Sequence, residues 1–273
     1  MEIETRALQM HLFEMMREFH RFCICHQLKY YMLGGTCLGA IRHSGFIPWD
    51  DDIDVGMPRP DYERFCMLAK DGLSKNLELR YYKNKHKSPF HFVKLVDRST
   101  TLVEKAYNNY VEGVYIDVFP LDGMKEYSFW GKIRARIIWF SKAIIIYHFT
   151  TNKKKKFKQR IFKLLAKLCP ISLVHVFVEH LMTLDKSTHP ELLCNFFGAW
   201  EPREIISNSV FGKPTLYPFE NDSFYGPEKA DAYLKSLYGD YMKMPPPEKR
   251  ICRHDFLYVN LNLPYEKYEK ENM

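Results

Sequence analysis

The sequence predicts an α+β fold, in which a mixed sheet is flanked by helices and extended by a basic helical insertion. Short runs rich in aromatic and β-branched residues are typical of strands, and they alternate with stretches whose apolar residues recur every three or four positions, as in helices. The 273 residues are 46% hydrophobic, enough to pack a sizeable core. Positive charge is concentrated in one central stretch with a helical pattern. These observations favour one compact unit with an insertion.

The N-terminal elements follow from local spacing. An amphipathic helix is expected over residues 3–25, because its apolar residues keep to one helical face. They are Leu8, Leu12, Met15, Phe19 and Phe22. A short strand at residues 30–33 runs into a Gly-Gly turn, and residues 38–42 begin a second helix. A strand, a turn of this kind and a helix start form a concavity whose backbone amides can meet phosphate oxygens.

The most informative segment is residues 49–57, where four carboxylates stand within five residues beside a tryptophan. From residue 52 onward aspartates alternate with apolar residues, as in a strand, where side chains two positions apart share a face. Asp52 and Asp54 would then repel each other unless a cation lies between them, and Mg²⁺ or Mn²⁺ suits such oxygen ligands. Asp51 should point the other way, as a turn cap, as a surface acid or as an acid that supports the residues of the site without contacting the substrate. The alternative for the whole segment is an Asp-rich surface turn.

Later elements complete the sheet. A helix is expected over residues 61–73, after two prolines. Three short strands are expected at residues 77–82, 90–96 and 101–103. Another strand, at residues 114–120, carries Asp117 and should end at Pro120. The last predicted helix, residues 227–237, has a proline in its first turn and Gly239 just past its end.

A Gly-Gly turn followed by an Asp-x-Asp strand is the two-part signature of the nucleotidyltransferase fold, and the detail of this chain resembles the LicD family. The first matching block covers residues 33–54, the second residues 116–123, and the third residues 238–254. The match runs from about residue 20 to 123 and resumes at about 210 to 255. Bacterial members of that family transfer phosphocholine from CDP-choline to glycans, and fukutin-related proteins share the core.

The resemblance implies roles for individual residues. The metal ligands would be Asp52, Asp54 and Asp117, and the acceptor hydroxyl's proton would pass to Asp117 or Asp50. The phosphates would be bound by Gly34, Gly35, Thr36, Arg42, His43, Lys94, Arg250 and His254. The last two lie four residues apart, one turn if helical, and an ion-pair anchor is the alternative role for them. A choline head group needs aromatic faces around its ammonium group. The candidates are Trp49, Tyr31, Tyr115 and Tyr225.

The charge distribution marks out the insertion. Residues 125–167 contain thirteen Lys or Arg and one acid, a net charge of +12, whereas the whole chain carries +7. Apolar residues are interleaved with these lysines, as in helices that lie in an anionic membrane surface. Packing of the apolar face on the core is the alternative interpretation. No recognition motif accompanies the basic run, so no nucleic-acid partner is expected.

Domain organisation and compartment follow from the same observations. We expect a catalytic core at residues 1–124, the insertion at 125–205, and a C-terminal part completing the catalytic unit at 206–273. Seven cysteines without a Cys-x-x-Cys pair and an acidic start without a signal-peptide pattern favour a cytoplasmic protein. No apolar run is long enough to cross a membrane, so a peripheral position on the inner face of the plasma membrane is expected.

The predicted function is metal-dependent transfer of phosphocholine from CDP-choline to a hydroxyl of a cell-surface glycan, such as lipopolysaccharide or teichoic acid, or to its lipid-linked precursor. The first alternative is transfer of ribitol phosphate, phosphoethanolamine, glycerol phosphate or a sugar phosphate from a similar donor. The second is a non-catalytic binding module. A site without catalytic function would not need carboxylates that repel one another, which disfavours the binding module.

Overall fold

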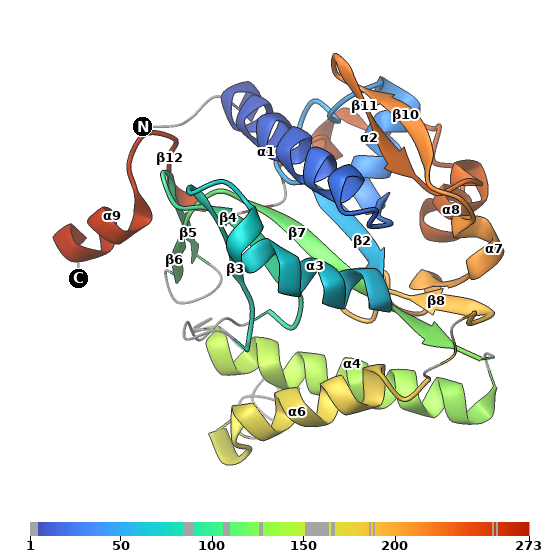
Figure 1. Ribbon diagram of the computed structural model, residues 1–273. Helices are drawn as coiled ribbons and strands as arrows, with labels where there is room; N and C mark the ends of the chain where they lie inside the picture. The colour runs from blue at the N-terminus through green and yellow to red at the C-terminus, as the bar shows by residue number, and fades with distance from the viewer. Residues whose placement is uncertain are drawn as a thin grey trace.

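The computed structural model is a mixed sheet with helices against it (Figure 1), which confirms the predicted fold class. It describes residues 5–83, 90–105, 110–125, 128–150, 164, 167–185, 187, 189–252, 254 and 256–272. The main sheet has the order β1 (Tyr31–Met32), β2 (Asp54–Pro58), β7 (Tyr115–Met124), β4 (Val93–Asp97) and β3 (Leu77–Arg80). β2 and β7 are parallel, and β7 also pairs with β8 (Leu192–Cys194), which pairs with β9 (Ile205–Ser207).

Helices cover this sheet because each buries one apolar stripe. α1 (Thr5–Cys25) and α3 (Arg59–Gly72) lie on the same side of it in Figure 1. α1 buries the apolar face that its spacing predicts, including Leu12, Phe19 and Phe22. α2 (Gly34–His43) packs against α8 (Ala230–Tyr238), and Gly239 ends α8 with a φ of 70°, a left-handed conformation that favours glycine.

Smaller elements complete the fold. A second sheet has the order β12 (Phe256–Asn260), β5 (Thr101–Glu104) and β6 (Tyr110–Glu112), and β10 (Thr215–Phe219) forms a hairpin with β11 (Asp222–Gly226). The remaining short elements are η2 (Glu201–Glu204), α7 (Asn208–Phe211), η3 (Pro247–Lys249) and α9 (Tyr265–Asn272).

Two expectations about strands are wrong. The strand predicted from residue 52 begins at Asp54, and Val55, Gly56 and Met57 are all buried, because β2 lies between β1 and β7 with both faces covered. β7 does not end at Pro120 but continues to Met124. The Asp117 N–H donates to Ile53 O, just before β2. Because successive N–H groups of a strand point to alternate sides, the nitrogen of Pro120 faces β4, whose pairing with β7 ends at Val118. No backbone donor is required there, so the proline is accommodated.

The Gly-Gly segment is also not a free turn. Gly34 and Gly35 form the first turn of α2 itself, and Leu33 caps the helix. The helix therefore starts four residues earlier than the residues 38–42 that helix propensity indicates. Glycines are poor helix formers, so the sequence alone favours a later start.

The basic insertion packs on the core. α4 (Phe129–Phe149) and α6 (Ile171–Met182) lie antiparallel across one end of the sheet (Figure 1). Ala135, Ile138 and Ile145 of α4 and Val178 of α6 are buried. The four lysines at 153–156 and most of the predicted helix at 157–168 lie outside the described residues. The packing alternative for the insertion therefore holds for the inner face of α4 and α6.

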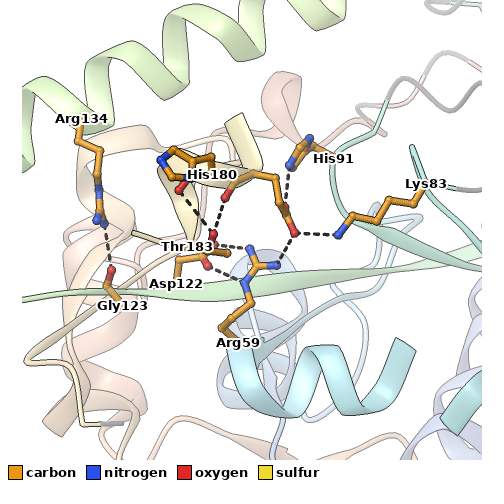
Figure 2. Close-up of polar contacts among 9 residues, drawn as sticks. Arg59, Lys83, His91, Asp122, Gly123, Arg134, His180 and Thr183 are labelled. Atoms are coloured by element: carbon orange, nitrogen blue, oxygen red, sulfur yellow. Dashed lines mark hydrogen bonds and ion pairs between the residues drawn. The ribbon is translucent and has the colours of Figure 1, made fainter. Parts of the chain in front are cut away.

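A buried polar network fastens α6 to the core (Figure 2). Glu179 of α6 accepts from Lys83 at 2.9 Å and Arg59 at 3.3 Å and contacts His91 at 3.0 Å. Arg59 also donates to Asp122 at the end of β7, at 2.7 and 2.9 Å. Each of these charged side chains therefore has a partner of opposite sign, as buried polar groups require.

Two buried histidines also join α6 to the core. His91 Nδ1 lies 3.0 Å from His175 Nδ1 on α6, and the ring of Tyr82 stacks on both imidazoles. Burial, and then the neighbouring His91, lower the pKa of His175 to about 3, and burial also lowers the pKa of His91. Both histidines are therefore neutral in the folded protein at neutral pH.

The histidine pair predicts a pH dependence of stability. Below about pH 6.5 the unfolded chain binds a proton at residue 175 that the folded protein does not bind until about pH 3. The free energy of unfolding should fall as pH falls through this window, by at most about 1.4 kcal/mol per pH unit for this residue. Urea unfolding between pH 7.5 and 5.0 measures the slope. His175→Phe keeps an aromatic ring beside Tyr82 and should flatten it, whereas an unchanged slope would contradict the assignment.

Candidate active site

A cavity of about 740 Å³ lies where the main sheet, α2, α4 and the C-terminal segments meet. Its walls include Gly34 and Gly35 of α2, Lys94 of β4 and Lys142 of α4. Four of the predicted acids line it, namely Asp50, Asp52, Asp54 and Asp117. Segments more than a hundred residues apart in sequence therefore share one concave site of a size suited to a small ligand.

The acids cluster because two strands bring them together. Asp54 and Asp117 are directly paired in the parallel register of β2 and β7. Asp52 stands two residues before β2 rather than on it, yet it lies close enough to raise the pKa of both. Burial, and then Asp52 and Asp117, raise the pKa of Asp54 well above its ordinary value. Burial also raises the pKa of Asp117, to about 8, against the opposing charge of Lys94.

One oxygen in this cluster lacks a partner. Asp117 Oδ1 is buried and has no hydrogen bond to any residue that the structure describes. A buried carboxylate oxygen of this kind normally accepts a hydrogen bond or binds a cation. Carboxylates that repel one another around an unsatisfied oxygen fit a hard divalent cation, which takes oxygen ligands. Among the described residues, the acids whose oxygens lie close enough to share one ion are Asp50, Asp51 and Asp52. Asp54 and Asp117 stand near Asp52, and its charge acts on both.

The first turn of α2 positions two of these acids. The Thr36 hydroxyl accepts the backbone N–H of Asp54 at 2.8 Å. A Cβ atom at Gly35 would lie 2.6 Å from Asp50 Oδ2, so a side chain at residue 35 would displace that carboxylate. A carboxylate at a helix N-terminus is stabilised by the helix dipole. The Gly34 N–H donates to Tyr233 Oη at 2.9 Å, so this amide already has a partner.

Asp51 is not a surface acid. It is buried, and His254 Nδ1 lies 2.8 Å from its Oδ1, while Cys252 Sγ donates to its Oδ2. Burial lowers the pKa of His254, but the contact with Asp51 and the charge of Asp52 outweigh it and raise that pKa to about 9. The ligand-capable oxygens of Asp50, Asp51 and Asp52 lie within 4.8 Å of one another. Because Asp51 already accepts two hydrogen bonds, we assign it to positioning His254 rather than to a cation.

The predicted phosphate-binding cations divide into two groups. Arg42 and His254 line the cavity, and Arg42 Nη1 donates to Tyr241 O at 2.7 Å. His43 and Arg250 are absent from the described lining, and Arg250 is exposed and donates to Pro245 O. Residues 250 and 254 do not share a helical turn, because η3 ends at Lys249.

Lys94 is buried and paired with two glutamates. Its side chain is 1% exposed, and Nζ donates to Glu112 at 2.7 Å and Glu104 at 3.0 Å. The same Nζ lies 3.3 Å from the ring centroid of Tyr115. Burial opposes the charge of Lys94, but Glu104 and Glu112 outweigh it and raise its pKa. Lys94 thus reaches the cavity wall as part of a buried ion cluster.

Two of the four aromatic residues predicted to contact the head group line the cavity, and two do not. Trp49 and Tyr115 line the cavity. Tyr31 is buried with its hydroxyl donating to Gly212 O, and the ring of Tyr225 packs on Tyr30 at 5.6 Å, so both lie with the neighbouring core.

Sequence reasoning missed a second group of lining residues. Trp200 and Tyr238 meet edge to face with ring centroids 5.1 Å apart, and Glu204 is a buried carboxylate beside them. Burial raises the pKa of Glu204 to about 7. Phe197 and Lys142 complete this side of the cavity. Tyr238 falls in the third motif block, whereas the others carried no local signal.

Paired carboxylates on adjacent strands beside a glycine-rich helix N-terminus define a phosphotransferase of the nucleotidyltransferase-fold class. A family model described as LicD/FKTN/FKRP, nucleotidyltransferase domain, matches residues 27–165, just over half of the chain. The chain belongs to this family, which confirms the predicted resemblance and the enzyme class.

Individual relatives agree with this assignment. The chain is 24% identical over 265 residues to the lipopolysaccharide cholinephosphotransferase LicD of Haemophilus influenzae, a match that covers 93% of this chain and 97% of the relative. An uncharacterised protein of Rickettsia typhi is 40% identical over 65 residues, which are 24% of this chain and 20% of that protein. One from Rickettsia prowazekii is 42% identical over 50 residues, 18% of this chain and 19% of that protein.

Proposed function

We propose that this protein transfers phosphocholine from CDP-choline to a hydroxyl of a cell-surface glycan or its lipid-linked precursor. The observation that carries the proposal is the carboxylate cluster with its unsatisfied Asp117 oxygen, on one wall of a cavity that is aromatic on another. The full-length similarity to a lipopolysaccharide cholinephosphotransferase supports the choice of head group and acceptor.

The proposed metal is Mg²⁺ or Mn²⁺, held by Asp52, Asp54 and Asp117. When bound, it would neutralise charge on the transferring phosphate and on the attacking oxygen. The carboxylate of Asp117 would accept the hydroxyl proton, because it lines the cavity directly beside Asp54. Asp50 is the alternative base. Arg42, in the last turn of α2, and His254 would bind the diphosphate, since both line the cavity and both carry positive charge.

The choline head group would be recognised by Trp200, Tyr238 and Glu204. A quaternary ammonium cannot donate a hydrogen bond, so it is recognised by aromatic faces and by negative charge. Ribitol, glycerol or sugar phosphates would instead require polar partners for their hydroxyl groups. Phosphoethanolamine shares the positive charge of choline and is the stronger alternative donor head group.

A calorimetric titration tests the donor. With Mg²⁺ or Mn²⁺ present, CDP-choline should bind at least about tenfold more tightly than CDP-ribitol or CDP-glycerol, with CDP-ethanolamine between them. Glu204→Gln should weaken CDP-choline binding by about tenfold and leave CDP-glycerol unchanged, because only the cationic head group uses that charge. Comparable weak binding of all four would mean that the head group is not recognised. Failure of all four to bind would place the donor outside this class.

We also propose a peripheral position on the inner face of the plasma membrane. Lipid-linked glycan precursors would be met there, and the net charge of +12 over residues 125–167 suits an anionic surface. Within the described parts of the chain, no helix is long and apolar enough to cross a membrane.

A further inference from the structure

The outer surfaces of α4 and α6 are unusually apolar. Trp130 is 74% exposed, Phe129 70% and Leu173 64%. The other large apolar side chains exposed on these helices are Ile137, Phe140, Val176 and Phe177. On α4, Trp130, Ile137 and Phe140 recur at spacings of seven and three, and Phe129 adjoins Trp130. On α6, Leu173 is followed by Val176 and Phe177 at spacings of three and four. Each helix therefore presents one apolar stripe to solvent and a second one to the core. Several large apolar side chains exposed on two packed helices are typical of an interaction site. We call these seven residues the outer face.

The charges around the outer face are positive. Lys132 and Arg136 are exposed on α4, and Lys167 is exposed just before α6. α4 and α6 contain a single acid, Glu179, which is turned inward and bound by Arg59, Lys83 and His91. The surface therefore combines aromatic and aliphatic side chains with positive charge and carries no exposed carboxylate within these two helices.

We propose that the outer face of α4 and α6 docks on an anionic lipid surface, with its apolar side chains at the boundary between headgroups and acyl chains. Trp and Phe beside Lys and Arg are the composition that favours this position. A second copy of the chain would bring like charges together across a symmetric contact, which disfavours that occupant. The buried network at Glu179 holds α6 on the core, so the helices can bind lipid without leaving the fold (Figure 2).

Docking also bears on the active site. Lys142 and Ile146 lie on the inner side of α4 and line the cavity, so one helix carries both the lipid-binding surface and a wall of the site. The Lys142 amine donates to Gly198 O at 2.7 Å, in the same loop region as Trp200. This step rests on the proposed function: docking would hold the cavity near the membrane surface, where a lipid-linked acceptor is found.

Vesicle sedimentation of the full chain tests the docking surface. The protein should bind vesicles of phosphatidylglycerol and phosphatidylcholine and bind pure phosphatidylcholine far more weakly. The triple variant Trp130→Ser, Phe140→Ser, Phe177→Ser should lose at least about tenfold in binding, because it removes three large apolar side chains whose burial in lipid favours binding. A matched control replaces three comparably exposed residues on other elements, Met67, Leu216 and Leu257, by serine and should bind as wild type.

Each other outcome overturns the proposal. Absence of wild-type binding to anionic vesicles excludes a lipid partner. Equal losses in the triple variant and the control would show that the outer face is not specific. A wild-type dimer that the triple variant converts to monomer would assign the face to a second copy. Sedimentation is measured without donor, and CDP-choline titration without lipid, so failure of one proposal is distinguishable from failure of the other.

Discussion

Replacing Asp54 by asparagine is expected to abolish transfer, lowering the rate by about a thousandfold or more, while the fold is retained. The substitution removes one carboxylate from the set that would hold the metal and changes the shape of the side chain little. Asp54 is directly paired with Asp117 across β2 and β7, so the two strands fix its position in the carboxylate cluster.

The same variant should be more stable than wild type when metal is absent. Because the pKa of Asp54 is raised on folding, the wild-type protein loses stability as pH rises from about 4 through the folded pKa. Asparagine does not titrate, so the variant should gain on the order of 1–3 kcal/mol in the free energy of unfolding at pH 8. Added Mg²⁺ should then stabilise wild type and leave the variant unchanged.

Activity assays and urea unfolding with and without Mg²⁺ separate these effects. Asp222→Asn removes an exposed carboxylate elsewhere on the chain and serves as the control. It should match wild type in turnover and in its response to Mg²⁺. Near-normal turnover of Asp54→Asn would show that the paired carboxylates are not the metal site.

Replacing Lys94 by methionine is expected to lower the free energy of unfolding by about 3–5 kcal/mol. Lys94 is the cation between Glu104 and Glu112, and all three side chains are buried. Methionine has a similar volume and leaves two buried carboxylates without their counter-ion, which is why the effect exceeds that of an ordinary core change. The second sheet, which carries both glutamates, should lose its attachment to β4 first.

A second set of substitutions distinguishes the loss of a counter-ion from a packing defect. Adding Glu104→Gln and Glu112→Gln to Lys94→Met removes the uncompensated charge and should recover more than half of the lost stability. Lys132→Met, an exposed change on α4, should alter stability by less than about 0.5 kcal/mol. Urea unfolding at one pH measures all three proteins. A triple variant as unstable as the single one would assign the defect to lost packing.

Much of the fold and part of the candidate site follow from local sequence. Asp54 and Asp117 were predicted to lie on neighbouring strands, and the structure pairs them directly. Strand propensity and the motif spacing are contained within a few consecutive residues, so the sequence is sufficient to identify them. Where an element begins or ends is less local. β2 starts at Asp54 and β7 continues past Pro120 because of the strands beside them, which local propensity does not describe.

The sequence by itself determined the family, the fold class and the acids that repel one another. Only the tertiary structure decided that Lys94 is a buried counter-ion, that Asp51 holds His254 and that Glu204 and Trp200 share the cavity with the aspartates. It also decided which face of α4 and α6 is exposed, since both faces are apolar in sequence. These contacts join segments far apart in the chain, and their partners are chosen by packing and charge neutralisation in three dimensions rather than by local spacing.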